Sequence, residues 1–340
     1  MKNCLICNKN PADKTGSHII PHFLLKRIDN EDGSTKRDKE MGFLLSEFHP
    51  SSYFGRATKP ETLEKVYGEE VTEERIANNK IPLVEDNIFC SDCEKRLGEI
   101  ESQYSETIKH KCKPNNNYQN LEDSFLAFIF WTSIVWRLSI AQKSGFKLNI
   151  SDEERLQMIL SQFLSIKNYD LDDLKKGGIL ENITYKALRS IDYSDGKSTV
   201  LFCHPDIQNP YFFVIDEFIL TFSIEKSISQ TGFESIDDEF SNCEINSAFS
   251  GEFIRSVEPK IIDGIQEYFY SELSKRYLLN LSKEIDIIHQ RLGGRGLLSM
   301  SIKEEIAKRI INDDEQPSGV KYTLKHKARI IFEVLKKYGG

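Results

Sequence analysis

The sequence lacks an apolar run long enough to cross a bilayer. Its most apolar stretch covers residues 125–136. This run is about 12 residues long, whereas a membrane-spanning helix needs about 20. The N-terminus, Met1-Lys2-Asn3-Cys4, also lacks the apolar segment of a secretory signal. We therefore expect a cytoplasmic protein that does not enter a membrane.

The sequence also lacks an excess of positive charge. It contains 45 Lys and Arg against 53 Asp and Glu, which gives a net charge of −8. This balance excludes a protein coated in positive potential for nonspecific nucleic-acid binding, but it leaves room for a local basic groove. With 340 residues, of which 39% are hydrophobic and 29% charged, the chain has the composition of a globular protein of up to two domains.

Cysteine is present in an odd number, seven. Four of these residues form two C-x-x-C pairs, Cys4 with Cys7 and Cys90 with Cys93. In a reducing compartment such pairs are metal ligands more often than disulfides. Four thiolates complete a closed tetrahedral zinc site, whose default role is structural. The three remaining cysteines are interpreted as small buried or incidental thiols: Cys112, Cys203 and Cys243.

Closure of a zinc site would bring His18, which lies between the two pairs, close to Glu94. Hydrolysis of a phosphodiester needs a base that takes a proton from water and a cation that neutralises charge on the phosphate. A histidine can supply the first, and Mg²⁺ or Mn²⁺ held by a carboxylate the second. His18 is thus a candidate general base or a structural hydrogen-bonding residue. Glu94 is a candidate ligand of the catalytic ion or an acid that favours a helix N-terminus.

The first domain is expected to cover residues 1–115. Pro21 disfavours helical geometry in the residue before it, so residues 18–20 should be extended, and a helix can start at Pro21. His22 either joins the site or lies on a solvated face. Residues 27–84 are polar and weakly patterned, which indicates a long insertion. Apolar residues at helical spacing predict a helix over 94–109.

A polar break at residues 113–120 separates this domain from a second one, predicted over 120–340. The second domain should be mainly helical, with antiparallel strands at about 182–225. Asp195-Gly196 predicts a hairpin turn between strands at 182–188 and 198–203. Further strands are expected at 211–215 and 218–224. The predicted helices of this domain are 121–143, which should be buried, 151–163, 259–290, 301–312 and 323–338.

The segment Ser17-His18-Ile19-Ile20-Pro21 between two C-x-x-C pairs resembles the HNH (His-Me finger, ββα-metal) endonucleases of the zinc-knuckle type. It is most similar to a group with a Ser-His-Ile-Ile-Pro core, a Cys-x-x-Cys-Glu second knuckle and an apolar helix that ends in Trp-Arg, here Trp136-Arg137. Proteins of this group are found in bacterial genomes, some of them beside anti-phage defence genes. The specific part of the resemblance covers residues 4–25 and about 85–109.

The resemblance implies roles for individual residues. His18 corresponds to the general base and Glu94 to the last ligand of the catalytic ion. The asparagine that orients the base should stand at Glu85, and the nearest asparagine is Asn87, which either orients His18 or is a turn residue. Ser17 occupies a position where the family usually has an acid or histidine ligand.

The predicted fold is α+β, with a zinc-stapled ββα-metal (treble-clef-like) N-terminal domain and a mainly helical C-terminal domain that contains a small antiparallel sheet. The first functional hypothesis is a Mg²⁺- or Mn²⁺-dependent endonuclease that acts on nucleic acid, with DNA favoured, and that serves anti-phage defence. It would work as a homo-oligomer or with a partner defence protein. The alternative is a catalytically inactive zinc-knuckle module that binds nucleic acid or protein. The basic run at 321–337 is either a solvated helix face or a phosphate-binding surface.

Overall fold

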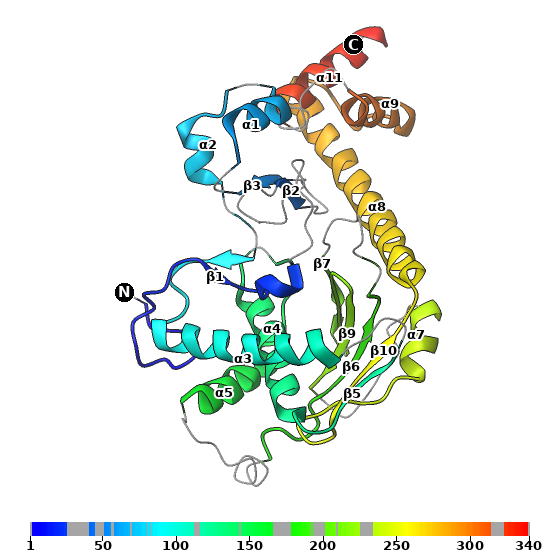
Figure 1. Cartoon of the computed structure of the whole chain (residues 1–340). Helices are drawn as coiled ribbons and strands as arrows, with labels where there is room; N and C mark the ends of the chain where they lie inside the picture. The colour runs from blue at the N-terminus through cyan, green and yellow to red at the C-terminus, as the bar shows by residue number, and fades with distance from the viewer. Residues whose placement is uncertain are drawn as a thin grey trace. The chain divides into compact units, whose positions relative to one another are not determined.

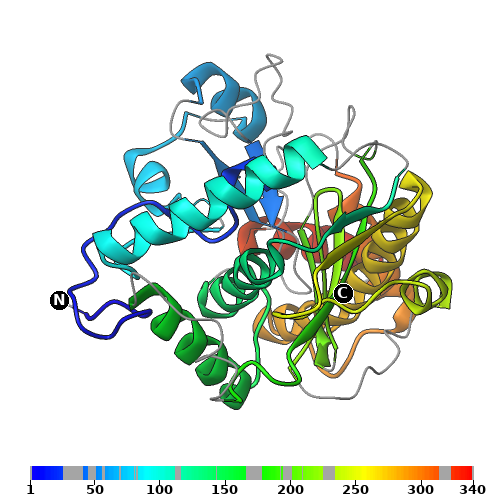
Figure 2. The same ribbon diagram turned by 60° about the horizontal axis from the view of Figure 1, so that its bottom comes forward.

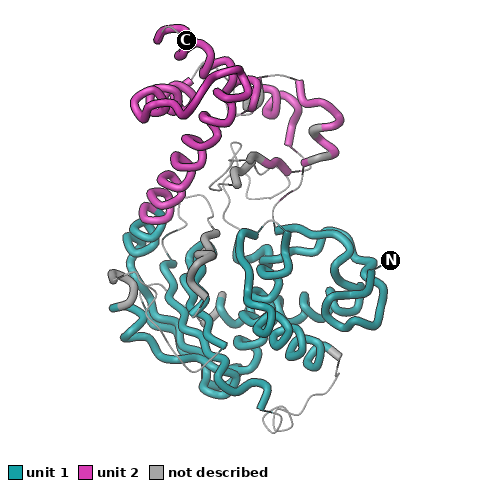
Figure 3. Tube along the Cα trace, turned by 180° about the vertical axis from the view of Figure 1, so that it is seen from behind, with its two compact units in different colours: residues 1–29, 82–266 teal, residues 30–81, 267–340 magenta. Residues whose placement is uncertain are grey.

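The computed structural model describes residues 2–25, 41–44, 51–55, 58–68, 70–79, 81, 83–111, 116–142, 144–165, 178–191, 193, 201–208, 210–224, 234–313 and 323–338. The chain divides into two compact units, residues 1–29 with 82–266 and residues 30–81 with 267–340 (Figure 3). The predicted insertion at 27–84 corresponds to the first segment of unit 2. The predicted domain boundary at 115–120 falls inside unit 1.

Unit 1 contains a six-stranded sheet in the order β5-β10-β6-β9-β8-β7. Its strands are β5 (Tyr118–Asn120), β10 (Glu252–Ser256), β6 (Thr184–Arg189), β9 (Phe218–Ser223), β8 (Tyr211–Ile215) and β7 (Leu201–Gln208). The sheet is mixed, because β10 runs parallel to β6 while the other neighbours are antiparallel. The α+β class is confirmed, and the strands expected at about 182–225 are antiparallel to one another, while β10 from outside this range adds one parallel pair.

The predicted hairpin, in which the strands at 182–188 and 198–203 pair with each other, is wrong. Strand β6 pairs with β9, and β7 pairs with β8. The tight hairpin joins β8 to β9 through Asp216 and Glu217, and Asp216 has a positive φ of 49°. Every residue of β9 is buried, and the strand lies inside the sheet with β6 and β8 at its two edges. Asp195 and Gly196, which suggested the hairpin, lie outside the described residues.

Helix α4 (Ser124–Ile140) lies at the centre of unit 1, as predicted for the buried helix over 121–143. Helices α3 (Ser91–Lys111) and α5 (Ile150–Ser165) lie on one side of it and the sheet on the other (Figures 1 and 2). Tyr104 of α3 stacks on Phe130 with ring centroids 3.9 Å apart, and Trp131 meets Phe218 of β9 at 5.5 Å. Among the described residues, no helix is both long and apolar enough to cross a membrane.

A carboxyl group lies at the junction of α3, α4 and the sheet. Glu252 of β10 is fully buried and accepts hydrogen bonds from Tyr104 Oη (2.7 Å), Trp131 Nε1 (3.2 Å) and Tyr185 Oη of β6 (3.3 Å). Burial raises the pKa of Glu252 to about 7, although its hydrogen bonds act in the opposite direction. The core of unit 1 therefore contains an acid that titrates near neutral pH.

Unit 2 contains the β2–β3 hairpin and a helical cluster. The hairpin strands are β2 (Met41–Leu44) and β3 (Ser51–Phe54), followed by α1 (Pro60–Tyr67) and α2 (Glu73–Asn78). Helix α8 (Pro259–Arg291) follows α7 (Glu234–Ser241) and passes from unit 1 into unit 2, where α9 (Met300–Ile311) and α11 (Leu324–Lys337) follow. Buried aliphatic residues such as Ile285, Ile306 and Ile331 join α8, α9 and α11. The helices predicted at 259–290, 301–312 and 323–338 are confirmed.

Candidate metal centre

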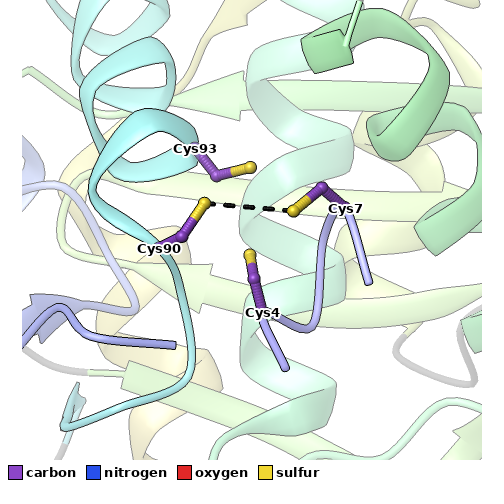
Figure 4. A group of neighbouring side chains, drawn as sticks. All are labelled: Cys4, Cys7, Cys90 and Cys93. Carbon is purple, nitrogen blue, oxygen red and sulfur yellow. Dashed lines mark hydrogen bonds between the residues drawn. The ribbon is translucent and has the colours of Figure 1, made fainter. Parts of the chain in front are cut away.

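The two C-x-x-C pairs meet in unit 1 (Figure 4). Cys4 and Cys7 come from the N-terminal turn, Cys90 directly precedes α3, and Cys93 lies in the first turn of α3. The four Sγ atoms lie within 4.8 Å of one another, and Cys7 Sγ is 3.9 Å from Cys90 Sγ. A zinc tetrahedron with Zn–S bonds of about 2.3 Å has S···S edges of about 3.8 Å. The predicted association is confirmed, and the cluster could hold a metal ion such as zinc.

The thiols of the cluster shift one another's pKa values. The Cys93 thiol hydrogen-bonds to Cys4 and lowers the pKa of Cys4 to about 4, with help from backbone amides, while the proximity of Cys4 raises the pKa of Cys93. Burial raises the pKa of Cys90. Four thiolates cannot coexist at this separation without a cation, because their charges repel one another. A divalent ion would replace the protons and supply that charge.

Backbone hydrogen bonds hold the two knuckles together independently of sulfur. Leu5 N donates to Ile88 O at 2.9 Å, and Lys14 N donates to Phe89 O at 3.1 Å. The Asp13 carboxylate accepts from Ser91 N at 3.0 Å and caps the N-terminus of α3. The first knuckle therefore stabilises the helix that carries the last cysteine.

Replacing Asp13 with alanine should lower the free energy of unfolding by about 1 kcal/mol, because the α3 amide loses its cap. Chemical denaturation followed by circular dichroism measures this change. Asp238→Ala, at an exposed position of α7, is the matched control and should stay within about 0.5 kcal/mol of the wild type. Equal losses in both variants would remove the capping role.

Two short strands accompany the cluster. Strand β1 (Ser17–His18) pairs antiparallel with β4 (Val84–Glu85), Ser17 opposite Glu85 and His18 opposite Val84. Of residues 18–20, which were predicted to be extended, His18 lies in this strand, whereas Ile19 and Ile20 form a bend. The following helical turn, His22–Leu25, is a 3₁₀ helix. In chain order β1 and β4 are followed by α3, the helix that carries Cys93.

The His18 side chain is exposed, and so is that of His22. The two ring centroids are 6.4 Å apart, with the rings nearly perpendicular. The carbonyl oxygen of His18 accepts a hydrogen bond from Arg137 Nη1 at 2.9 Å. The peptide of His18 is therefore fixed from the protein interior while its imidazole reaches solvent, where a substrate can approach it.

Glu94 lies in the first turn of α3, and its side chain is partly buried. Burial raises the pKa of Glu94, which the nearby Ser17 hydroxyl and the Arg137 guanidinium oppose. Ser17 is fully buried. Within the described part of the chain, neither Ser17 Oγ nor Glu94 Oε2 has a hydrogen-bond partner at standard distance. One oxygen of Glu94 thus retains its capacity to accept a hydrogen bond or to bind a cation.

Asn87 lies in a turn, with a positive φ of 57°. Its side chain is exposed, and its backbone N donates to Lys14 O at 2.7 Å. The strand register places Val84 opposite His18 and leaves Asn87 beyond the Ser17–Glu85 pair. This position fits the turn interpretation of Asn87. Glu85, which stands at the position expected for asparagine, accepts from Gln142 N at 2.9 Å.

The structure adds Arg137 to the site. This residue is 2% exposed and forms an ion pair of 2.7 Å with Glu101 of α3. The sequence identifies Arg137 only as part of the Trp-Arg ending of the apolar helix. Its position in an otherwise uncharged apolar helix is a signal that could have identified it, since a buried arginine requires polar partners.

In the described ranges, the four cysteines are the only group of three or more His, Cys, Asp and Glu side chains close enough to share a metal ion. No known protein family, curated protein or solved structure matches the chain.

Proposed function

We propose that the protein is a metal-dependent nuclease of the HNH type, built on a zinc-stapled ββα arrangement. The observation that carries this proposal is the convergence of β1, β4 and the start of α3 at the four-cysteine cluster. The imidazole of His18 is exposed on strand β1. Ser17, the other residue of this strand, lies beside Glu94. A zinc ion bound by four thiolates has no open position, so it would act as scaffold and not as catalyst.

In this mechanism the His18 imidazole takes a proton from a water molecule, whose oxygen forms a bond to phosphorus as the bond to the leaving oxygen breaks. Histidine suits this role because its ordinary pKa lies near neutrality. Glu94 would hold a Mg²⁺ or Mn²⁺ ion, which supplies positive charge to the phosphate and the leaving oxygen when bound. Arg137 holds the His18 peptide in place.

The resemblance at Ser17–Pro21 favours nucleic acid, DNA first, as the substrate. It also favours a role in bacterial anti-phage defence, in which a second copy of the chain or another defence protein is the partner. The chain as a whole carries a net charge of −8, which repels the phosphate backbone of a nucleic acid. A hydrolase of this kind would therefore bind its substrate only at the surface around His18.

A second function, a zinc-knuckle module that binds nucleic acid or protein without cleaving it, is favoured by the surroundings of Glu94. Its carboxylate is partly buried and lies near Arg137, whose positive charge opposes cation binding. In the part of the chain that the structure describes, His18 and Glu94 are not joined by a third ligand residue in a metal-binding cluster.

Nuclease assays separate the two functions. Supercoiled plasmid, single-stranded DNA and RNA are incubated with Mg²⁺ or Mn²⁺. His18→Ala should lower cleavage by about 100-fold or more, since general-base catalysis contributes 10²–10⁴-fold. His289→Ala, in α8 of unit 2, is the control and should cleave as the wild type does. Equal cleavage by His18→Ala and wild type, or no cleavage by either, removes the catalytic proposal.

A further inference from the structure

Helix α4 carries one charged residue, Arg137, in an otherwise uncharged sequence. The residue is 2% exposed. Burial of a guanidinium is costly unless its donors are hydrogen-bonded and its charge is paired. Its partners therefore indicate what the protein gains from keeping a charge at this position.

The partners of Arg137 belong to three elements. Nη1 donates to Glu101 Oε1 of α3 at 2.7 Å and to the carbonyl oxygen of His18 at 2.9 Å. Within α4, Nε donates to Ser133 O at 3.2 Å and Nη2 to Ser133 Oγ at 3.1 Å. The guanidinium plane is thus fixed on α4, and its outer edge joins α3 to β1.

Strand β1 is short, and besides its pairing with β4 it lies against α3 through Ser17, which is beside Glu94. It contains two residues, and its pairing with β4 is correspondingly short. The neighbouring bond from Ile19 N to Leu83 O, at 2.8 Å, also leads toward β4 and not toward α3. The guanidinium of Arg137 therefore bridges the peptide of His18 and Glu101, which lies on the helix that carries Glu94.

We propose that Arg137 is a positioning residue, which sets the place of the His18 imidazole relative to the start of α3. This inference rests on the proposed function for its kinetic consequence, but the placement itself can be measured without activity. Lysine cannot replace arginine here, because an ammonium is a point charge and cannot hold the planar set of bonds to Glu101, His18 and Ser133 together.

The kinetic experiment uses the full-length protein and the conservative variant Arg137→Lys. We expect kcat for nucleic-acid cleavage to fall at least tenfold with KM within about twofold, since small displacements of a base cost rate more than binding. Arg155→Lys is the matched control. Arg155 of α5, in the same unit, donates to the carbonyl oxygens of Ile179 and Ile224. Equal kcat values in the two variants overturn the inference.

The second readout is the NMR spectrum of the histidine rings, with the His18 signals assigned by their loss in His18→Ala. Arg137→Lys should shift the His18 ring signals and their pH titration, whereas Arg155→Lys should leave both unchanged. If the wild type cleaves nothing, the proposed nuclease function fails, and this readout alone decides the inference. His18 signals that are identical in Arg137→Lys and wild type overturn it.

A second variant, which keeps Arg137, tests the proposal even if Arg137→Lys does not fold. Glu101→Gln removes the ion pair but leaves a neutral acceptor, and it should shift the His18 signals in the same direction as Arg137→Lys by a smaller amount. Circular dichroism and metal content establish that each variant is folded. If Arg137→Lys does not fold, an unchanged His18 signal in folded Glu101→Gln overturns the proposal.

Discussion

Cys90→Ala is expected to abolish metal binding and to unfold the N-terminal knuckle region of unit 1. Binding of a structural zinc ion contributes on the order of 10 kcal/mol to the folding of small domains. Loss of one thiolate leaves three ligands. The backbone hydrogen bonds between the knuckles cannot replace the free energy of metal binding that is then lost. Metal analysis should find far less than one zinc ion per chain, and thermal unfolding should begin at a markedly lower temperature. A chelator should have the same effect on the wild type.

The matched control is Cys243→Ala. Cys243 is also buried in unit 1, but it lies outside the cluster and its thiol donates to Ala187 O at 3.4 Å. This variant should keep its full metal content and lose only about 1 kcal/mol. A Cys90→Ala protein with one zinc ion per chain and an unchanged unfolding temperature would falsify the structural metal site.

Glu252→Gln is expected to change how stability depends on pH. Burial raises the pKa of Glu252 from 4.5 to about 7 in the folded protein, so the folded state binds this proton more tightly than the unfolded chain does. Stability associated with the proton is fully present below about pH 4.5 and is lost as the pH rises to about 7. The difference corresponds to roughly 3 kcal/mol, at about 1.4 kcal/mol for each tenfold change in proton affinity.

The glutamine variant lacks this proton and should show a correspondingly flatter profile, most clearly between pH 5 and 8. Chemical denaturation at a series of pH values measures the free energy of unfolding for both proteins. Glu122→Gln, an exposed position in the same unit, serves as control and should follow the wild type. Parallel profiles for Glu252→Gln and wild type would mean that the acid is ionised in the folded core or is not buried there.

The sequence predicted the helices well because their signals are local. The apolar run from Phe125 to Trp136 could only be a buried helix or a strand, and its length decided for the helix. The cysteine cluster was also predictable, since two C-x-x-C pairs are the typical spacing of a shared metal site. Pro21 predicted extended backbone over residues 18–20, but its steric effect acts directly only on Ile20, which lies in a bend, and His18 is extended because β1 pairs with β4.

The remaining features depend on contacts between distant residues. Strand β10 pairs in parallel with β6 through a crossover of the chain that no local pattern encodes. Glu252 is polar, yet it belongs to the core because Tyr104, Trp131 and Tyr185 come together from separate elements. The role of Arg137 likewise required the position of His18, which lies 119 residues earlier in the chain.

The spacing of the two knuckles has a consequence for the evolution of the chain. Cys7 and Cys90, whose sulfur atoms are neighbours, are 83 residues apart in sequence. Closure of a flexible loop of this length costs about 4 kcal/mol of chain entropy, but a doubling of its length adds only about 0.6 kcal/mol. A metal ion bound by all four cysteines would offset the first cost, and the second would then matter little. The intervening segment can therefore gain or lose whole structural elements while the imidazole, the acid and the thiolates at its ends keep their places.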